Sequence, residues 1–542
     1  MIDFNKQDWW KEAVIYQIYP KSFQDSNGDG IGDLPGITSR LDYLHKLGVD
    51  ALWLCPVLAS PQVDNGYDVS DYRSIDPMFG SMEDMRTLIR EARARGIGIL
   101  MDLVLNHTSD QHRWFQQACQ GRDNPYHDYY IWRDGAPGAL PNDMRAAFGG
   151  PAWTYVPALG QYYFHQFAPQ QPDLNWANPA VRQELYAMIR FWMDQGVEGF
   201  RLDVIDQIAK EPDRKITANG PRLMELLREL NRETWGGKNL VTVGEAWGAD
   251  IPRARQYSAP DGSVFSMVFQ FEQMCLDHEA DKWVPKAMAL PELKASIARW
   301  QQGLHGCGWN SLFWDNHDLP RIVSRWGDDG ACRADSAKAL AVALHGLQGT
   351  PYIYQGEELG MTNAHFASIG QYRDVESLNY YQILQQQGKT PAQAMEIIQQ
   401  RSRDNGRTPM QWDASAHAGF TTGTPWIGVV DNYRTINAAA EVGDPDSIYS
   451  YYKQLVALRK QRPVIQSGRI EFLYKDDPDL LAYRRWDETG ELLVLCNLTA
   501  HDAPVALPQG WQNAGVLLGN YPDGAPGASL RPYEALVLER RV

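Results

Sequence analysis

Long hydrophobic runs are absent from this sequence, and so is any recognisable targeting segment. No stretch reaches the roughly 18 apolar residues that a membrane-spanning helix needs. The opening residues, MIDFNKQDWW, contain no basic region followed by an apolar one, which is the pattern of a secretory signal. We therefore expect no membrane partner and a cytoplasmic location.

Cysteine is scarce and shows no paired pattern. The six cysteines in 542 residues are Cys55, Cys119, Cys275, Cys307, Cys332 and Cys496. None of them forms a pair with the spacing of a metal-binding or redox motif. Scattered cysteines of this kind are typical of buried free thiols in a reducing compartment, and we expect that state here.

The sequence has fewer basic than acidic residues. The 51 lysines and arginines against 67 aspartates and glutamates give a formal net charge of −16 at pH 7. An acidic surface repels phosphate backbones and anionic lipids, which argues against a nucleic-acid partner. The 19 Trp and 26 Tyr are numerous and fit either large cores or surfaces that stack on sugar rings.

Eight short apolar runs alternate with amphipathic segments between residues 14 and 355. The predicted strands are 14–20, 51–56, 98–104, 199–204, 240–245, 266–270, 311–315 and 351–355. The helical patterns between them include 81–95, 179–195, 221–235 and 333–347. A repeated strand–helix order predicts a parallel sheet with right-handed crossovers, and eight units predict a closed (β/α)₈ barrel of the α/β class.

Two long segments interrupt this order and a different pattern ends it. Residues 105–174 follow the third predicted strand and 362–435 follow the eighth, at the barrel face where active sites are built. Short strands at 469–474, 480–486, 492–497 and 535–538 predict a small antiparallel β domain. We predict a barrel domain of residues 1–104 and 175–469, an inserted domain of 105–174 and a C-terminal β domain of 470–542.

Charged side chains gather at the carboxyl ends of strands three, four, five and seven. They are Asp102, His107, Arg201, Asp203, Glu245, His317 and Asp318. Glycoside hydrolysis needs one carboxylate that attacks the anomeric carbon and one carboxyl group that protonates the leaving oxygen. Neighbouring strands can hold such a pair at the about 5–5.5 Å of a retaining mechanism. We predict Asp203 as the nucleophile and Glu245 as the general acid/base.

The other strand-end residues support this pair. Arg201 lies two residues before Asp203, on the same side of the strand, so its charge is expected to keep Asp203 ionised. Asp318 is expected to bind ring hydroxyls and stabilise the transition state, with His107 and His317 as hydrogen-bond donors to the same sugar. Each motif alone has an ordinary explanation, either an ion pair or a turn, but their joint occurrence at strand ends favours catalysis.

In these motifs the sequence resembles the α-amylase family of glycoside hydrolases. The four strand-end motifs match the regions shared by that family, a segment at 171–175 resembles a fifth, and the similarity extends over almost the whole chain. The resemblance implies a covalent glucosyl intermediate on Asp203. It also implies a subsite for the non-reducing glucose formed by Asp64, Tyr67, His107, Phe167, Arg201, His317 and Arg403. Asp64 with Arg403 would grip the terminal 4-hydroxyl and impose exo action, whereas Asp64 or Phe167 alone is equally explained by loop packing.

Within the family, the chain is most similar to the members specific for α-1,6 bonds. Those members carry a valine directly after the nucleophile, as this chain does with Val204, whereas 1,4-specific maltases carry Ala or Thr at that position. The alternative explanation is that Val204 is an ordinary strand residue. Trp247 and Lys282 resemble acceptor-side residues of the same subgroup. The resemblance implies that the protein is a monomeric enzyme that releases α-glucose from isomaltooligosaccharides or dextran. Its expected partner is therefore a small-molecule or oligosaccharide α-glucoside substrate.

Other activities stay open at this point. Relatives include α-1,4-glucosidases, trehalose-6-phosphate hydrolases, and sucrose isomerases or transglucosidases. The isomerases carry an arginine-rich motif after the seventh strand, where residues 369–376 offer only Arg373, and no basic phosphate cradle is evident. A non-catalytic sugar-binding subunit would lack one of the three carboxylates, all of which are present.

Oxygen-bearing side chains alternate in residues 25–33. The candidate ligands are Asp25, Asn27, Asp29, Asp33 and the backbone carbonyl of Ile31. They copy the start of an EF-hand loop, although its twelfth position is Gly36 and not Glu. Hard oxygen ligands favour a structural Ca²⁺, with Mg²⁺ as the second choice. A metal-free turn is the alternative.

Overall fold

Eight parallel strands form the centre of the molecule. They are β1 (Ile15–Ile18), β2 (Ala51–Leu54), β5 (Gly98–Val104), β9 (Gly199–Asp203), β10 (Val241–Glu245), β11 (Met267–Phe269), β12 (Ser311–Leu312) and β13 (Thr350–Tyr354). In this computed structural model, which describes residues 2–540, they pair in the order β11–β10–β9–β5–β2–β1–β13–β12. An isolated parallel bridge between Val268 and Asn310 joins the two ends of the sheet. The predicted (β/α)₈ barrel is confirmed.

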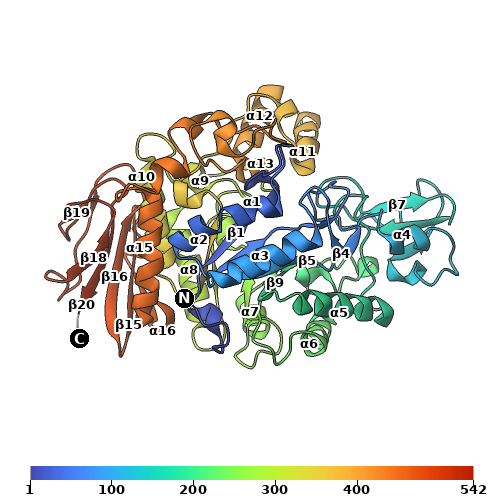
Figure 1. Ribbon diagram of the computed structural model, residues 1–542, viewed down its shortest axis with the longest axis horizontal. Helices are drawn as coiled ribbons and strands as arrows, with labels where there is room; N and C mark the ends of the chain where they lie inside the picture. Colours follow the sequence, from blue (N-terminus) through green and yellow to red (C-terminus); the bar gives the residue numbers. More distant parts are fainter. Residues whose placement is uncertain (1, 541–542) are drawn as a thin grey trace.

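Helices between the strands cover the outside of the barrel (Figure 1). They are α1 (Leu34–Ser39), α2 (Leu41–Leu47), α3 (Met82–Ala94), α5 (Pro179–Asp194), α6 (Leu223–Glu233), α7 (Ile251–Tyr257), α8 (Leu290–Leu304), α9 (Ile322–Arg325) and α10 (Arg333–His345). Helix α3 illustrates why they form where predicted. Ser81 and Asp84 make a capping box at its start, and Met85, Leu88 and Ala92 bury one face.

Two insertions extend the loops that follow β5 and β13. The first carries α4 (Arg113–Ala118) and an antiparallel sheet of β6 (Trp132–Asp134), β8 (Gln161–Phe164) and β7 (Trp153–Val156), at the right of Figure 1. The short strands β3 (Leu58–Ala59) and β4 (Asp71–Ile75) belong to neither insertion; they lie between β2 and α3 and pair with each other. The second insertion carries α11 (Val375–Gln386), α12 (Pro391–Arg401) and α13 (Asp404–Arg407). Both insertions therefore stand over the carboxyl ends of the barrel strands.

A five-stranded antiparallel sheet lies at the C-terminal end, at the left of Figure 1. Its strands are β14 (Arg469–Leu473), β15 (Leu480–Asp487), β16 (Gly490–Asn497), β20 (Ala535–Arg540) and β18 (Gly515–Gly519); β17 (Ala503–Pro504) pairs with β19 (Ser529–Leu530), and α14 (Ala438–Glu441), α15 (Ile448–Gln461) and α16 (Pro463–Ser467) precede them. The Tyr483 hydroxyl donates to the carbonyl of Ala343 in α10 at 3.1 Å, which ties the sheet to the barrel. Residues 1, 541 and 542 of the predicted domains lie outside the described residues.

The cysteines depart in part from the expectation. All six are free, as expected, but only Cys55 and Cys496 are buried, and Cys275 is exposed. The prediction of buried thiols is therefore wrong for the other four. Within residues 2–540, no helix is both long and apolar enough to cross a membrane.

Candidate active site

Strand register brings the predicted catalytic groups into one layer. Asp102 of β5 pairs with Arg201 of β9, and Arg201 pairs with Val243 of β10. Side chains two residues further along a strand point to the same side. Asp203 and Glu245 therefore end neighbouring strands on the face that carries Arg201.

One guanidinium group contacts both predicted catalytic carboxylates. Nη1 of Arg201 donates to Oδ1 of Asp203 and to Oδ1 of Asp102, each at 2.8 Å, and Nη2 makes a short ion pair with Oε2 of Glu245. All four side chains are buried. Because the guanidinium group is planar and rigid, it fixes the two carboxylates relative to each other. The structure thus brings together the residues predicted for the reaction.

Burial and neighbouring charges act on the pKa of Asp203 in opposite directions. Burial raises the pKa of the Asp203 carboxyl, the charges of Glu245 and its neighbouring aspartates raise it further, and Arg201 lowers it. The net direction of the pKa is upward. Arg201 acts in the predicted direction, toward the ionised carboxylate that a nucleophile needs, while burial and the neighbouring carboxylates act against it.

Both oxygens of Glu245 accept hydrogen bonds. Besides Arg201, the backbone N–H of Val204 donates to Oε2 at 3.1 Å, and the indole N–H of Trp247 donates to Oε1 at 2.8 Å. Val204 has φ 34° and ψ 45°, a left-handed conformation that a β-branched residue rarely adopts. This turn directs the Val204 N–H at Glu245.

Asp318 is paired with two arginines from the second insertion. Arg407 donates to Oδ1 of Asp318 at 2.8 Å, and Arg403 lies 3.2 Å from the same oxygen. Burial raises the pKa of Asp318, but His317 and the two arginines outweigh burial, and the net pKa is lowered. Burial lowers the pKa of His317 to about 3, so at neutral pH the arginines supply the positive charge.

An ion pair closes the predicted terminal-glucose end of the site. Arg403 joins Asp64 at 3.0 Å and Asp374 at 2.6 Å, and Gln171 donates to Oδ2 of Asp64 at 3.1 Å. Burial raises the pKa of Asp64 to about 6, although Arg403 opposes this. This end of the cavity is therefore a wall of hydrogen-bonding groups.

Aromatic and imidazole rings form the sides of the same subsite. The Tyr67 hydroxyl lies 3.0 Å from Oδ2 of Asp102 and 2.6 Å from Nε2 of His317. The rings of His107 and Phe167 lie 5.2 Å apart. Burial lowers the pKa of His107 to about 4, so its ring is neutral at neutral pH and offers a hydrogen bond without charge.

These groups surround a cavity of about 410 Å³, a size typical of small-molecule sites. Predicted residues that line it are Asp64, Tyr67, His107, Phe167, Asp203, Val204, Glu245, Trp247, Lys282, Asp318 and Arg403. Arg201 and His317 lie behind this lining, where they hold Asp203 and Tyr67 in place.

The lining of the cavity contains two residues that the sequence analysis missed. Lys282 makes an ion pair with Glu376 at 2.6 Å, and both line the cavity. Glu376 belongs to α11 of the second insertion, and the position of that insertion above the barrel was its only signal. Phe148 of the first insertion also lines the cavity, with the Arg403 guanidinium 4.8 Å from its ring centroid. Single residues in these insertions carry no sequence pattern that identifies them as part of the site.

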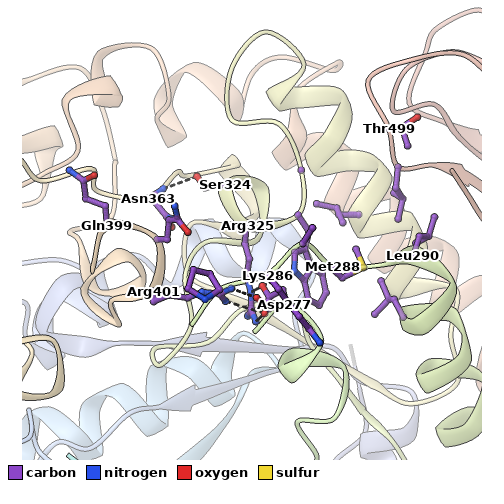
Figure 2. A pocket seen from close by; sticks show the side chains of 18 of the residues that line it. Asp277, Lys286, Met288, Leu290, Ser324, Arg325, Asn363, Gln399, Arg401 and Thr499 are labelled. Atoms are coloured by element: carbon purple, nitrogen blue, oxygen red, sulfur yellow. Dashed lines mark hydrogen bonds and ion pairs between the residues drawn. The ribbon is translucent and has the colours of Figure 1, made fainter. Parts of the chain in front are cut away.

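A second cavity, of about 840 Å³, lies beside the catalytic one (Figure 2). Arg325 and Arg401 line both cavities, and each forms an ion pair with Asp277, at 2.6 Å and 3.0 Å. Figure 2 shows these three side chains together at the centre of the view. The two cavities thus share a wall of buried ion pairs, and no residue predicted for catalysis lines the larger one.

The predicted metal loop is a series of turns whose residues do not line the catalytic cavity. Asp25 accepts the N–H of Gly30 at 2.8 Å, and Asp29 accepts that of Ile31 at 2.9 Å. Oxygen donors alone suit Ca²⁺ or Mg²⁺ by type. Between residues 2 and 540, however, no three or more His, Cys, Asp or Glu side chains form a group able to hold a metal. The metal stays a prediction.

Comparisons with known proteins agree with the architecture of the site. A family model described as the alpha amylase catalytic domain matches residues 17–468. An oligo-1,6-glucosidase of Parageobacillus thermoglucosidasius is 48% identical over 98% of this chain and 99% of its own, and a glucan 1,6-alpha-glucosidase of Streptococcus pneumoniae is 52% identical over 91% and 92%. The crystal structure of a trehalose-6-phosphate hydrolase from Bacillus licheniformis matches 98% of the chain, and 99% of its own, with a TM-score of 0.93 and 47% identity.

Proposed function

The chain belongs to the α-amylase family of glycoside hydrolases, and on that premise we propose that it is a retaining, exo-acting enzyme for α-1,6-linked glucose at non-reducing ends. The family and the relatives support the coarser statement, that it is a glycoside hydrolase with α-glucosidase activity. The stereochemistry, the direction of attack and the linkage are argued from the site.

The shared guanidinium of Arg201 is the observation that carries the proposed mechanism. Its contacts with both Asp203 and Glu245 favour the about 5–5.5 Å separation of retaining enzymes over the about 6.5–9.5 Å of inverting ones. Asp203 attacks the anomeric carbon while Glu245 gives its proton to the departing oxygen. Glu245 then takes a proton from water, the water oxygen bonds to the anomeric carbon, and Asp203 is released with net retention.

The closed end of the cavity supports exo action. The ion pair between Asp64 and Arg403 occupies the position where a further glucose unit on O4 would have to continue. Paired charges there form hydrogen bonds to a terminal hydroxyl, and a longer chain would separate them at a high electrostatic cost. One glucose unit therefore fits beyond the bond that is cleaved.

The acceptor end favours a neutral sugar over a phosphorylated one. Each lysine and arginine that lines the cavity is paired with a carboxylate: Lys282 with Glu376, Arg403 with Asp64, and Arg325 and Arg401 with Asp277. A trehalose 6-phosphate site needs cations free to bind a dianion. Glu376 would repel that group, so we favour isomaltooligosaccharides, with the bulk of Val204 as the second argument for the 1,6 linkage.

Initial rates on isomaltose, isomaltotriose, dextran, maltose, sucrose and trehalose 6-phosphate test this proposal. We expect isomaltose and isomaltotriose to give the highest kcat/KM, and proton NMR of the first product to show α-glucose. A preference for trehalose 6-phosphate would refute the substrate, and β-glucose as the first product would refute the retaining mechanism.

A further inference from the structure

The indole N–H of Trp247 points at the proposed general acid. It donates to Oε1 of Glu245 at 2.8 Å, and Trp247 also lines the cavity. We infer that Trp247 is the positioning residue for the general acid. This inference rests on the proposed roles of Asp203 and Glu245.

The hydrogen bonds decide which oxygen of Glu245 carries the catalytic proton. Arg201 and the backbone N–H of Val204 both donate to Oε2, so that oxygen is held as an acceptor. The proton therefore resides on Oε1. A carboxyl oxygen has two lone-pair directions, and the Trp247 N–H occupies one of them. The remaining direction of Oε1 is left for the proton and the glycosidic oxygen, so Trp247 sets the line of proton transfer.

The indole ring is held rigidly enough for this role. It stacks on the ring of Phe271, with centroids 3.8 Å apart and planes 6° apart, and Phe271 itself is buried. The next residue, Gly248, donates its N–H to Asp206 at 2.9 Å, which fixes the backbone on the other side. Packing against Phe271 therefore fixes the plane of the indole ring and, with it, the direction of the N–H.

Leaving-group dependence tests the role of the Trp247 N–H. Trp247→Phe keeps a ring on Phe271 and removes the N–H, and replacement of residue 247 by benzothienylalanine keeps the bicyclic shape and removes only the donor. We expect both variants to lose about tenfold or more in kcat/KM on methyl α-glucoside and isomaltose, whose leaving oxygens need protonation. On α-glucosyl fluoride, which needs little acid assistance, the loss should be within about twofold. The value of kcat/KM reflects only the steps up to and including the first irreversible one. The later attack of water on the glucosyl intermediate therefore does not affect the comparison.

Trp247→Ala also removes the N–H and should show the same leaving-group pattern. Equal losses on the fluoride and on methyl glucoside in Trp247→Phe and in the benzothienylalanine variant would overturn the inference, because damage to packing does not distinguish leaving groups. The substrate series is informative for any retaining α-glucosidase, so a wild-type enzyme that prefers another linkage would refute the proposed substrate and leave this test intact.

Discussion

The backbone N–H of Val204 donates to Oε2 of Glu245 at 3.1 Å, which connects the residue after the proposed nucleophile directly to the proposed acid. The contact requires Val204 to adopt φ 34°, a conformation that costs about 1–3 kcal/mol for a residue other than glycine. The backbone of Val204 therefore positions the acid, while its side chain, which lines the cavity, shapes the acceptor end.

Shortening this side chain should alter linkage preference and leave the hydrogen bond in place. We expect Val204→Ala to raise the ratio of kcat/KM for maltose over isomaltose by about tenfold, because removing buried methyl groups is worth about 1–3 kcal/mol of discrimination. Val204→Ile, which keeps the branch at Cβ, is the matched control and should not raise the ratio. An unchanged ratio in the alanine variant would exclude Val204 as a determinant of linkage.

Asp203→Asn should abolish turnover and preserve the fold. Loss of a nucleophile costs about 10⁴-fold or more in kcat, and the amide does not attack the anomeric carbon. The thermal unfolding midpoint should be equal or higher, because burial and three nearby carboxylates raise the pKa of Asp203. Near-normal hydrolysis of 4-nitrophenyl α-glucoside by this variant would remove Asp203 from the mechanism.

Neutralising Glu376 tests how the site excludes phosphate. Glu376→Gln leaves the ammonium group of Lys282 without its partner at 2.6 Å. We expect kcat/KM for trehalose 6-phosphate to rise about tenfold, because a charge-assisted contact to phosphate is worth about 1.5–3 kcal/mol, and kcat/KM for isomaltose to fall. The double variant with Lys282→Met is the control and should lose the gain. If trehalose 6-phosphate is no better a substrate for Glu376→Gln, charge at this pair does not determine specificity.

Regular elements and strand-end motifs were predictable from the sequence. The short apolar runs predicted all eight barrel strands, and β5 was predicted with the bounds observed. A short buried run between turn residues is compatible with few structures other than a strand. The carboxyl ends of parallel strands meet at one face, so strand order alone brought Asp203 and Glu245 together.

Contacts made by the two insertions were not predictable in this way. Glu376 reaches Lys282 across 94 positions of sequence, and Phe148 reaches Arg403 from a different insertion. The net pKa of Asp203 depends on burial and on several carboxylates at once, and the spacing of Arg201 reveals only one of these contributions. The left-handed turn at Val204 is a local conformation that its β-branched side chain disfavours, and only the surrounding fold imposes it.

The contribution of Asp315 to stability should fall as pH rises from about 4 to 7. Burial raises the pKa of Asp315 to about 7 from the ordinary 3.8. Between those values the folded chain retains a proton that the unfolded chain has released, so the stabilisation is complete below about pH 4 and is lost as pH passes about 7. The shift corresponds to on the order of 4 kcal/mol.

Thermal unfolding between pH 4 and 8 checks this dependence. Asp315→Asn should flatten the decline, because it removes the group that must ionise in a buried position. Asp277→Asn is the opposite control: its arginine partners lower the pKa of Asp277 despite burial, so Asp277 stabilises at neutral pH and loses this effect in acid. A wild-type slope in Asp315→Asn would assign the pH dependence to other carboxyls.

Removal of divalent cations tests the predicted loop at residues 25–33. If the loop holds Ca²⁺, a chelator should lower the unfolding midpoint and added Ca²⁺ should restore it, since a ligand at 100 times its Kd stabilises the folded state by about 2.7 kcal/mol. Asp29→Asn can keep the turn to the Ile31 N–H and removes a charge, so its midpoint should respond less to Ca²⁺. Rates on isomaltose at 25 °C should stay unchanged, because the loop does not line the catalytic cavity. Identical midpoints in chelator and in Ca²⁺ would mean that hydrogen-bonded turns such as those from Asp25 to Gly30 and from Asp29 to Ile31 are sufficient to hold the loop.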